Sequence, residues 1–174
     1  DPDLHVGSSV GTIQELVNVG ARTSPSYEVR GPLRDWNDLD IDVGFWSAPE
    51  LIDWEGDGDL DLFAGSGVGR IHFYRNDGSA GAPAFRLVDA QFAGVRGDFN
   101  AVPALGDLDG DGDLDLLVGE FGSTLNPRLF YMRNDGTTES PLWVQVSNNT
   151  NSTFIFAERV FQGNLAPELF DLDG

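Results

Sequence analysis

The chain is a succession of short apolar runs, each separated from the next by a turn rich in glycine, aspartate or asparagine. The runs mix branched aliphatic and aromatic residues, as in Leu-Asp-Leu-Leu-Val at 114–118, and end at residues such as Gly119. Asn-Asp-Gly sequences at 76–78 and 134–136 follow two of the runs, and Asn-Gly or Asp-Gly between apolar segments is a strong hairpin signal. The one window compatible with a helical period, 11–19, aligns with two predicted strands. The pattern therefore predicts an all-β protein built from antiparallel hairpins.

A set of sequence landmarks recurs in the same order along the chain and defines a repeat. Residues 11–20, 69–78 and 127–136 align with one another, and each is followed at a fixed distance by a proline and then an aromatic residue. A further landmark, Ala-Pro-Glu-Leu or Val-Pro-Ala-Leu, stands at 48–51, 102–105 and 166–169. Repeats of a few tens of residues are typical of solenoids and propellers.

Each repeat is expected to form four antiparallel strands. In one copy the predicted strands are 103–106, 114–118, 128–133 and 142–146. Four-stranded units repeated in this way predict the blades of a β-propeller. We therefore interpret the chain as a single propeller segment, residues 1–174, with a partial blade at 1–47, blades at 48–101 and 102–165, and the start of another at 166–174.

Two predicted hairpins carry a nine-residue acidic sequence, which we call the acidic frame. The clearer copy is Asp-Leu-Asp-Gly-Asp-Gly-Asp-Leu-Asp at 107–115, and the other, at 53–61, has Glu55 in its third position. Five like charges packed this closely favour a bound cation, and Ca2+ takes about six to eight oxygen ligands from flexible, carboxylate-rich loops. In the clearer copy the first three acidic residues converge on one side of a turn, the fourth offers its backbone carbonyl and the fifth closes the far side. A solvated acidic loop explains an isolated run, but the recurrence favours metal binding.

Fragments of the acidic frame stand at both ends of the chain. Asp1 and Asp3 match the end of a frame, and Asp171 and Asp173 match its beginning. The chain therefore begins and stops inside its own motif, and three repeats are fewer than the roughly four blades that close a propeller. We expect the rest of its own propeller, or further copies of the chain, to complete the ring.

Composition narrows the range of functions. Much of the formal net charge of −19 lies in the acidic frames, and so acidic a surface is a poor match for nucleic acid, whose phosphates require clustered basic residues. The chain has no cysteine, which excludes disulfides and thiol chemistry. No apolar run approaches the ~20 residues that span a membrane.

These landmarks resemble the FG-GAP/VCBS repeat family, the repeat of integrin α-subunit propellers. The acidic frames followed by Leu-x-x-Gly, the Gly-x-Ile-x-x-Tyr-Arg-Asn-x-Gly stretch and the later Pro-x-Phe carry the resemblance, which extends over essentially the whole chain. It implies a β-propeller with Ca2+ bound in the blade hairpins. The ligands that it implies are Asp53, Glu55, Asp57, Asp59 and Asp61 in one site and Asp107, Asp109, Asp111, Asp113 and Asp115 in the other. Glu55 departs from the usual aspartate, which implies weaker or differently arranged binding at the first site.

The remaining features favour a protein that acts outside the cell. Two adjacent N-glycosylation sequons begin at Asn148 and Asn151, in a polar stretch that we expect to be an exposed loop after the fourth strand. Together with the resemblance, they predict an extracellular or cell-surface glycoprotein. We expect it to bind an extracellular protein or glycan and to serve in adhesion or structural assembly.

No catalytic constellation stands out in the sequence. The two histidines, His5 and His72, occupy strand positions that other residue types fill in the sister repeats, and no serine lies in a recognisable nucleophile elbow. We therefore expect this chain to bind rather than catalyse. A carbohydrate-active propeller, either a lectin or a polysaccharide lyase, is the alternative. The tryptophans open to stacking on sugars, or to packing between blades, are Trp36, Trp46, Trp54 and Trp143.

Overall fold

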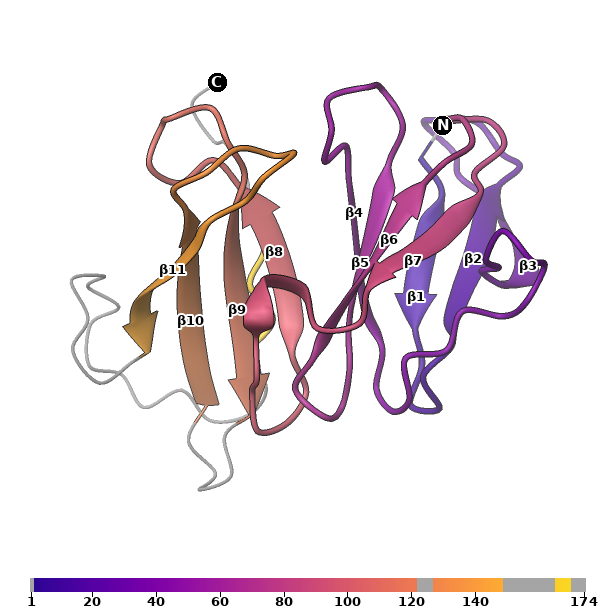
Figure 1. Cartoon of the computed structure of the whole chain (residues 1–174). Helices are drawn as coiled ribbons and strands as arrows, with labels where there is room; N and C mark the ends of the chain where they lie inside the picture. Colours follow the sequence, from indigo (N-terminus) through magenta and orange to yellow (C-terminus); the bar gives the residue numbers. More distant parts are fainter. Residues whose placement is uncertain (1, 122–126, 149–164, 170–174) are drawn as a thin grey trace.

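The computed structural model describes residues 2–121, 127–148 and 165–169 of the chain. These residues form three antiparallel β-sheets that stand side by side, and their helical content is one short 3-10 segment, η1 (Phe92–Gly94) (Figure 1). No helix in this part of the chain is long and apolar enough to cross a membrane. The prediction of an all-β fold is confirmed.

Each sheet is a meander, in which strands adjacent in sequence pair with one another. The first sheet contains β1 (Leu4–Gly7), β2 (Ile13–Asn18) and β3 (Tyr27–Pro32). The second contains β4 (Ala48–Ile52), β5 (Asp61–Gly65), β6 (Ile71–Asn76) and β7 (Phe85–Asp89). The third contains β8 (Val102–Gly106), β9 (Asp115–Phe121), β10 (Pro127–Asn134) and β11 (Trp143–Asn148). The second and third sheets thus have the four strands expected of one repeat.

Each complete acidic frame connects the first two strands of its sheet. Ile52 pairs with Asp61 across β4 and β5, and Gly106 pairs with Asp115 across β8 and β9. The two frames are therefore hairpin loops, as the sequence predicts, and both lie along the upper edge of the molecule in Figure 1.

One strand extends further than the sequence predicts. The predicted fourth strand over 142–146 is followed by a loop, whereas β11 continues to Asn148. The last two residues of β11 pair with Tyr131 and Phe130, because β10 is eight residues long and offers backbone partners over that length. The first predicted glycosylation site therefore lies at the end of a strand and not in a loop, while Asn151 lies outside the described residues.

An asparagine side chain closes the turn that precedes the last strand of each sheet. Asn76 Oδ1 accepts hydrogen bonds from the backbone N–H groups of Gly78 (3.0 Å) and Ala84 (2.8 Å). Asn18 and Asn134 accept an equivalent pair of bonds in the other two sheets. The recurring asparagine of the sequence landmark is therefore a turn residue that fixes the hairpin.

Close backbone approach sets the spacing between neighbouring sheets. A Cβ on Gly65, at the end of β5, would lie 1.9 Å from the carbonyl oxygen of Ala101, so this contact requires a glycine. The same contact recurs at two further places, between Gly7 and Ser47 at 1.8 Å and between Gly119 and Leu165 at 2.3 Å. One packing relation therefore links successive units along the chain.

Two apolar cores fill the spaces between the sheets. The core between the first and second sheets includes Ile13, Leu33, Leu62, Tyr74 and Phe85. The core between the second and third sheets is largely aromatic and includes Trp54, Phe63, Phe73, Phe92 and Trp143. Trp54 projects from the first acidic frame into this core and stacks on Trp143, with ring centroids 6.1 Å apart. These two tryptophans are packing residues, whereas Trp36 and Trp46 are exposed.

The outer face of the first sheet is apolar and exposed. Leu4 and Val6 of β1 are 42% and 47% exposed, and Tyr27 of β3 is 37% exposed. The residues at the corresponding positions of the second sheet are buried in the core against the first sheet; they are Leu62, Ala64 and Phe85. The first sheet therefore presents the kind of surface that, one sheet further along, a neighbouring sheet covers.

Candidate metal centre

The second acidic frame gathers three carboxylates around one point. Oxygen atoms of Asp107, Asp109 and Asp115 all lie within 4.8 Å of one another, in the loop between β8 and β9. Asp107 and Asp109 are exposed, whereas Asp115, the first residue of β9, is 0% exposed. Carboxylates held this close repel one another unless a positive charge lies among them.

Three hydrogen bonds hold Asp115 in place. Its Oδ1 accepts from the backbone N–H of Asn134 (2.9 Å), and its Oδ2 accepts from the N–H of Leu108 (3.1 Å) and the hydroxyl of Tyr131 (2.8 Å). A carboxylate has about four lone-pair sites, so one acceptor site remains for a further partner. The buried side chain thus ties the acidic loop to β10.

The same anchor recurs at the equivalent aspartate of the other two sheets. Asp61 Oδ1 accepts from the N–H of Asn76 at 2.7 Å, and its Oδ2 accepts from the N–H of Trp54 at 3.1 Å. Asp3 Oδ1 accepts from the N–H of Asn18 at 2.7 Å, which places Asp3 at the last position of a frame. The other residues of the predicted partial sites lie outside the described part of the chain: Asp1, Asp171 and Asp173.

The first residue of each frame shapes the turn that follows it. Asp107 accepts hydrogen bonds from the backbone N–H groups of Gly110 (2.7 Å) and Gly112 (3.0 Å). Both glycines have positive φ, 82° and 97°, a backbone that glycine adopts without strain. Asp53 accepts equivalent bonds in the first frame. The glycines therefore let the loop wrap back over its first carboxylate.

The first frame is arranged differently, around Glu55. Burial, together with a hydrogen bond to Asp61 and the negative charge of Asp61, raises the pKa of Glu55 to about 7. Burial also raises the pKa of Asp61. Phe73 stands at the position that Tyr131 occupies in the third sheet, so it has no hydroxyl to donate to the buried aspartate. The buried aspartate therefore has a tyrosine hydroxyl as partner in the third sheet, whereas in the second sheet its neighbour is the longer acid Glu55.

Each frame has an arginine close to its third residue. Arg133 Nε lies 3.8 Å from Asp109 Oδ2, and Arg75 Nε lies 3.7 Å from Glu55 Oε1. Each guanidinium is also paired with the aspartate two residues further along the chain. Each arginine is shared with an aspartate outside the frame, so it offsets only part of the negative charge of the five acidic residues. A bound cation would reduce the repulsion that remains.

The side chains of the fifth and seventh frame residues stay outside the cluster. Asp111 is exposed, and its Oδ1 accepts a hydrogen bond from the N–H of Asp113 at 3.0 Å. Asp57 accepts the same bond from Asp59 in the first frame, also at 3.0 Å. Among the described residues the first frame gathers no group of three carboxylates at the spacing found in the second. The structure thus brings together three of the five ligands expected in the second frame.

The cluster in the second frame fits a hard divalent cation. Ca2+ binds carboxylate and other oxygens at about 2.3–2.6 Å, and oxygens within 4.8 Å of one another can surround one ion of that size. The cluster contains no histidine or cysteine, the ligands that zinc and copper prefer. Its chemistry therefore favours Ca2+.

Two residues that contribute to the site were not among the predicted site residues. Asn134 donates its backbone N–H to Asp115, and its recurrence as Asn18 and Asn76 in the other copies was the available signal. Tyr131 carried no such signal, because its hydroxyl contact to the buried aspartate is found in one copy of the repeat.

A buried ion pair lies on the third sheet, at the opposite end of β9 from the acidic frame. Glu120 is 0% exposed, its Oε1 lies 2.6 Å from Arg128 Nε, and its Oε2 accepts a hydrogen bond from the N–H of Asp98 at 2.8 Å. Arg128 also pairs with the Asp98 carboxylate. Burial raises the pKa of Glu120. The network ties the segment before β8 to the end of β9, which is a structural role.

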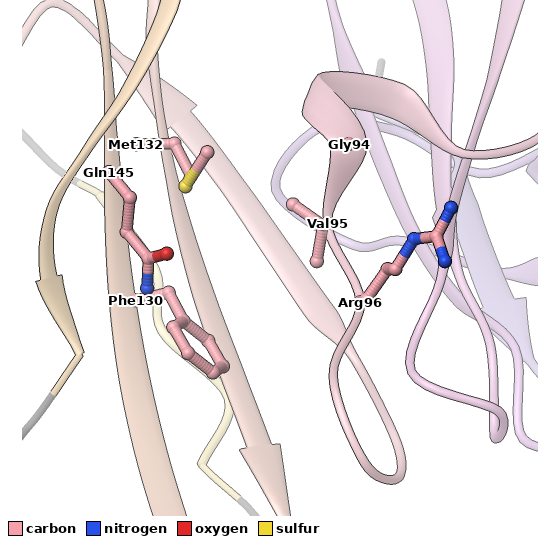
Figure 2. A pocket seen from close by; sticks show the side chains of 6 residues that line it. All are labelled: Gly94, Val95, Arg96, Phe130, Met132 and Gln145. Atoms are coloured by element: carbon pink, nitrogen blue, oxygen red, sulfur yellow. The ribbon is translucent and has the colours of Figure 1, made fainter.

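A small cavity lies between η1 and the third sheet. It has a volume of about 150 Å³ and is lined by Gly94, Val95, Arg96, Phe130, Met132 and Gln145. Figure 2 shows Val95 turned toward the sheet and Arg96 turned away from it. Ligand sites usually exceed about 300 Å³, so this cavity is a packing gap between sheets and not a candidate site.

The fold and the acidic loops together define a repetitive all-β protein with a candidate cation site. Within that class, residues 53–118 match the FG-GAP-like repeat family, and the match contains both complete acidic frames. No curated protein and no solved structure matches the chain. Residues 53–118 are therefore similar to an FG-GAP-like repeat, as the sequence resemblance predicts for this part of the chain.

Proposed function

We propose that this chain is a Ca2+-stabilised segment of a β-propeller, which acts outside the cell as a binding, adhesion or assembly module and is not itself an enzyme. The observation that carries the proposal is the cluster of Asp107, Asp109 and Asp115 within an FG-GAP-like repeat. In such a module the metal loops hold the sheets in shape, and other surfaces contact the partner.

The way in which successive sheets pack supports the propeller arrangement. The same glycine contact links each unit to the next, and an apolar core fills each space between sheets. The exposed apolar face of the first sheet supports a further sheet beyond it, from the rest of the same propeller or from another copy. Covering that face would remove apolar surface from water, which is the main driving force of association.

In this proposal the role of Ca2+ is architectural. When bound, the ion supplies the positive charge that offsets repulsion among the carboxylates. Asp107, Asp109 and Asp115 would hold it in the second frame. Because Asp115 is also hydrogen-bonded to β10, neutralising the cluster stabilises the hairpin and not the loop alone. The first frame would bind more weakly, since its carboxylates are not gathered at the spacing found in the second frame.

An extracellular or cell-surface location and an extracellular protein or glycan partner belong to the same proposal. The sequons at Asn148 and Asn151 and the family resemblance support that location. Ca2+ sites of extracellular modules have dissociation constants of about 10⁻⁴–10⁻³ M. An affinity in that range is what we expect of exposed loops such as these.

Thermal unfolding of the full chain tests the proposal. A ligand that binds only the native state, present at a concentration about 100 times its dissociation constant, raises the free energy of unfolding by about 2.7 kcal/mol per site. We therefore expect saturating Ca2+ to raise Tm by roughly 5–20 °C over a chelated sample, for one or two sites in a chain of this size. Asp109→Asn should lose most of the shift, and Glu139→Gln, an exposed acid outside the frames, should keep it. An identical Tm with Ca2+ and with chelator would refute the proposal.

A carbohydrate-active propeller is the second candidate function. The exposed indoles of Trp36 and Trp46 support it, because such rings stack on sugars. Cleavage of an acidic polysaccharide, followed by the absorbance of its unsaturated product, would favour this candidate. Binding without turnover would favour the module.

A further inference from the structure

The connection between the first and second sheets contains an insertion that the next connection lacks. Between β7 and β8 the chain makes the short turn η1, and two residues separate the buried side chains of Phe92 and Val95. Between β3 and β4 the buried residues that fill the same role in the other core are Leu33 and Ile41, and seven residues separate them. We call residues 34–40 the inserted loop. In repeat proteins, insertions within single repeats often lie on the binding face.

The base of the inserted loop is fixed to both neighbouring sheets. The N–H of Leu33 donates to the carbonyl of Ile13 in β2 at 2.7 Å, and the N–H of Ile41 donates to the carbonyl of Leu33 at 2.9 Å. The N–H of Trp36 donates to the carbonyl of Phe85, the first residue of β7, at 2.9 Å. Because β7 is the last strand of its sheet, the loop extends from a buried base along a sheet edge.

Asp35 closes the tip of the inserted loop. Its Oδ1 accepts hydrogen bonds from the backbone N–H groups of Asn37 (2.8 Å) and Leu39 (3.0 Å), and its own N–H donates to the carbonyl of Leu39 at 2.8 Å. Arg34 donates a further bond to the Asp38 carboxylate at 2.8 Å. A loop that is already ordered in this way loses little conformational entropy when a partner binds, which favours affinity.

The tip exposes two large apolar side chains. Trp36 is 61% exposed and Leu39 is 63% exposed, whereas Leu33 and Ile41 at the base are buried. Covering exposed side chains of this size is favourable, and tryptophan is among the residues that contribute most to protein interfaces. Small molecules bind mainly in concave sites, whereas these side chains project from a loop and suit a pocket in a larger partner.

Negative charge surrounds the apolar pair. The side chains of Asp38 and Asp40 are 82% and 48% exposed, and Arg34, which pairs with both, is the one basic residue of the inserted loop. Chiefly the hydrogen bond from the Leu39 N–H lowers the pKa of Asp35, so this third acid is also charged at neutral pH. Three acids and one base leave the loop with a net charge of −2. Charge complementarity therefore favours a basic partner surface.

We propose that the inserted loop docks a protein partner, with Trp36 and Leu39 entering an apolar pocket that arginine or lysine side chains of the partner border. The inference rests on the proposed function as a binding module, and it names the surface used and the chemistry of the partner. It differs from the carbohydrate alternative, because it requires the leucine and the carboxylates as well as the indole.

Panning a random-peptide phage library against the immobilised full chain in Ca2+ tests the inference. We expect the most enriched peptides to combine basic with apolar residues. Their affinity, measured by fluorescence anisotropy of the labelled synthetic peptide, should fall as salt rises, because opposite charges meet across the contact. Absence of enrichment, or enriched peptides without basic residues, would overturn the inference.

Truncation of the two apolar side chains shows whether the selected peptide binds at the inserted loop. Trp36→Ala should lower its affinity by at least about tenfold, and Leu39→Ala by about threefold or more. Leu142→Ala removes a leucine that is 61% exposed ahead of β11, and this control should change the affinity less than about twofold. Unchanged affinity in Trp36→Ala would overturn the inference.

Asp38→Asn tests the role of charge without disturbing the inserted loop. Asparagine tolerates the φ of 63° at this position, and its side-chain oxygen can still accept from Arg34. We expect a lower affinity with a weaker salt dependence, whereas Glu139→Gln, an exposed acid outside the loop, should change neither. Equal effects of the two substitutions would contradict the role of charge.

Thermal unfolding of the same samples separates binding from folding. All of these variants alter exposed side chains, so their Tm should stay within about 2 °C of the unmodified chain. The rise in Tm with Ca2+ decides the proposed function independently of the peptide results.

Discussion

Replacing Gly65 by alanine is expected to destabilise the protein severely. The added Cβ would lie 1.9 Å from the carbonyl oxygen of Ala101 and 2.8 Å from its carbonyl carbon, and both are backbone atoms that cannot rotate away. The second and third sheets must then separate along the core that they share. Overpacking usually costs about 1–3 kcal/mol, and a clash with backbone belongs at or above the top of that range. A loss of about 3 kcal/mol lowers Tm by roughly 6–12 °C in a chain of this size.

Gly81→Ala provides the matched control for that experiment. Gly81 lies in a turn of the same sheet, a Cβ there meets nothing within 4 Å, and its backbone does not have positive φ. We expect its stability to stay within about 0.5 kcal/mol of the unmodified chain, or to rise slightly. Thermal or urea unfolding measures both variants. Equal stability of the two would mean that the sheets do not approach one another through Gly65.

Replacing Asp115 by alanine is expected to cost about 3–5 kcal/mol even when the protein is free of metal. Three donors lose their shared acceptor: the N–H groups of Leu108 and Asn134 and the hydroxyl of Tyr131. Each unsatisfied buried group costs about 1–3 kcal/mol, partly offset by removing a buried charge. The variant should also lose the stabilisation by Ca2+ that the second frame provides.

Asp109→Ala distinguishes the anchor from the ligand. Asp109 belongs to the same cluster but is exposed, and its Oδ1 accepts a single long hydrogen bond of 3.3 Å from Asp111. In chelator its stability should therefore lie within about 0.5 kcal/mol of the unmodified chain, while its response to Ca2+ falls as in Asp115→Ala. Urea unfolding in chelator measures the stability of the metal-free protein, and the same measurement in Ca2+ gives the stabilisation by the ion. Equal losses for the two variants in chelator would contradict the anchoring role of Asp115.

Much of the fold could be read from the sequence because it repeats. The three aligned landmarks fix the strand order, and the equivalence of Asp3, Asp61 and Asp115 follows from that alignment alone. The structure adds the reason. Each of these aspartates accepts a hydrogen bond from the backbone N–H of the asparagine that ends the next strand of its sheet. Local sequence signals and packing agree at these positions, so the sequence alone was enough to predict that the three aspartates are equivalent.

The parts that the sequence did not predict depend on contacts between distant residues or on single copies. The end of β11 is set by the length of β10, with which its last residues pair. Those last residues are polar, so the sequence pattern predicted a loop there. The Tyr131 hydroxyl contact occurs where the other four-stranded sheet has Phe73. The backbone of Trp46 is set by its hydrogen bond to Ser9, and nothing in the residue type itself signals a positive φ. Such features need coordinates, because the residue types alone do not encode them.

Calorimetric titration of the metal-free full chain with Ca2+ tests the central claim most directly. We expect saturable binding of two ions per chain, with the tighter site lost in Asp109→Asn and the weaker site lost in Glu55→Gln. Glu139→Gln should bind as the unmodified chain does. Absence of any heat of binding at millimolar Ca2+, in protein shown to be folded by its near-ultraviolet circular dichroism, would contradict the account.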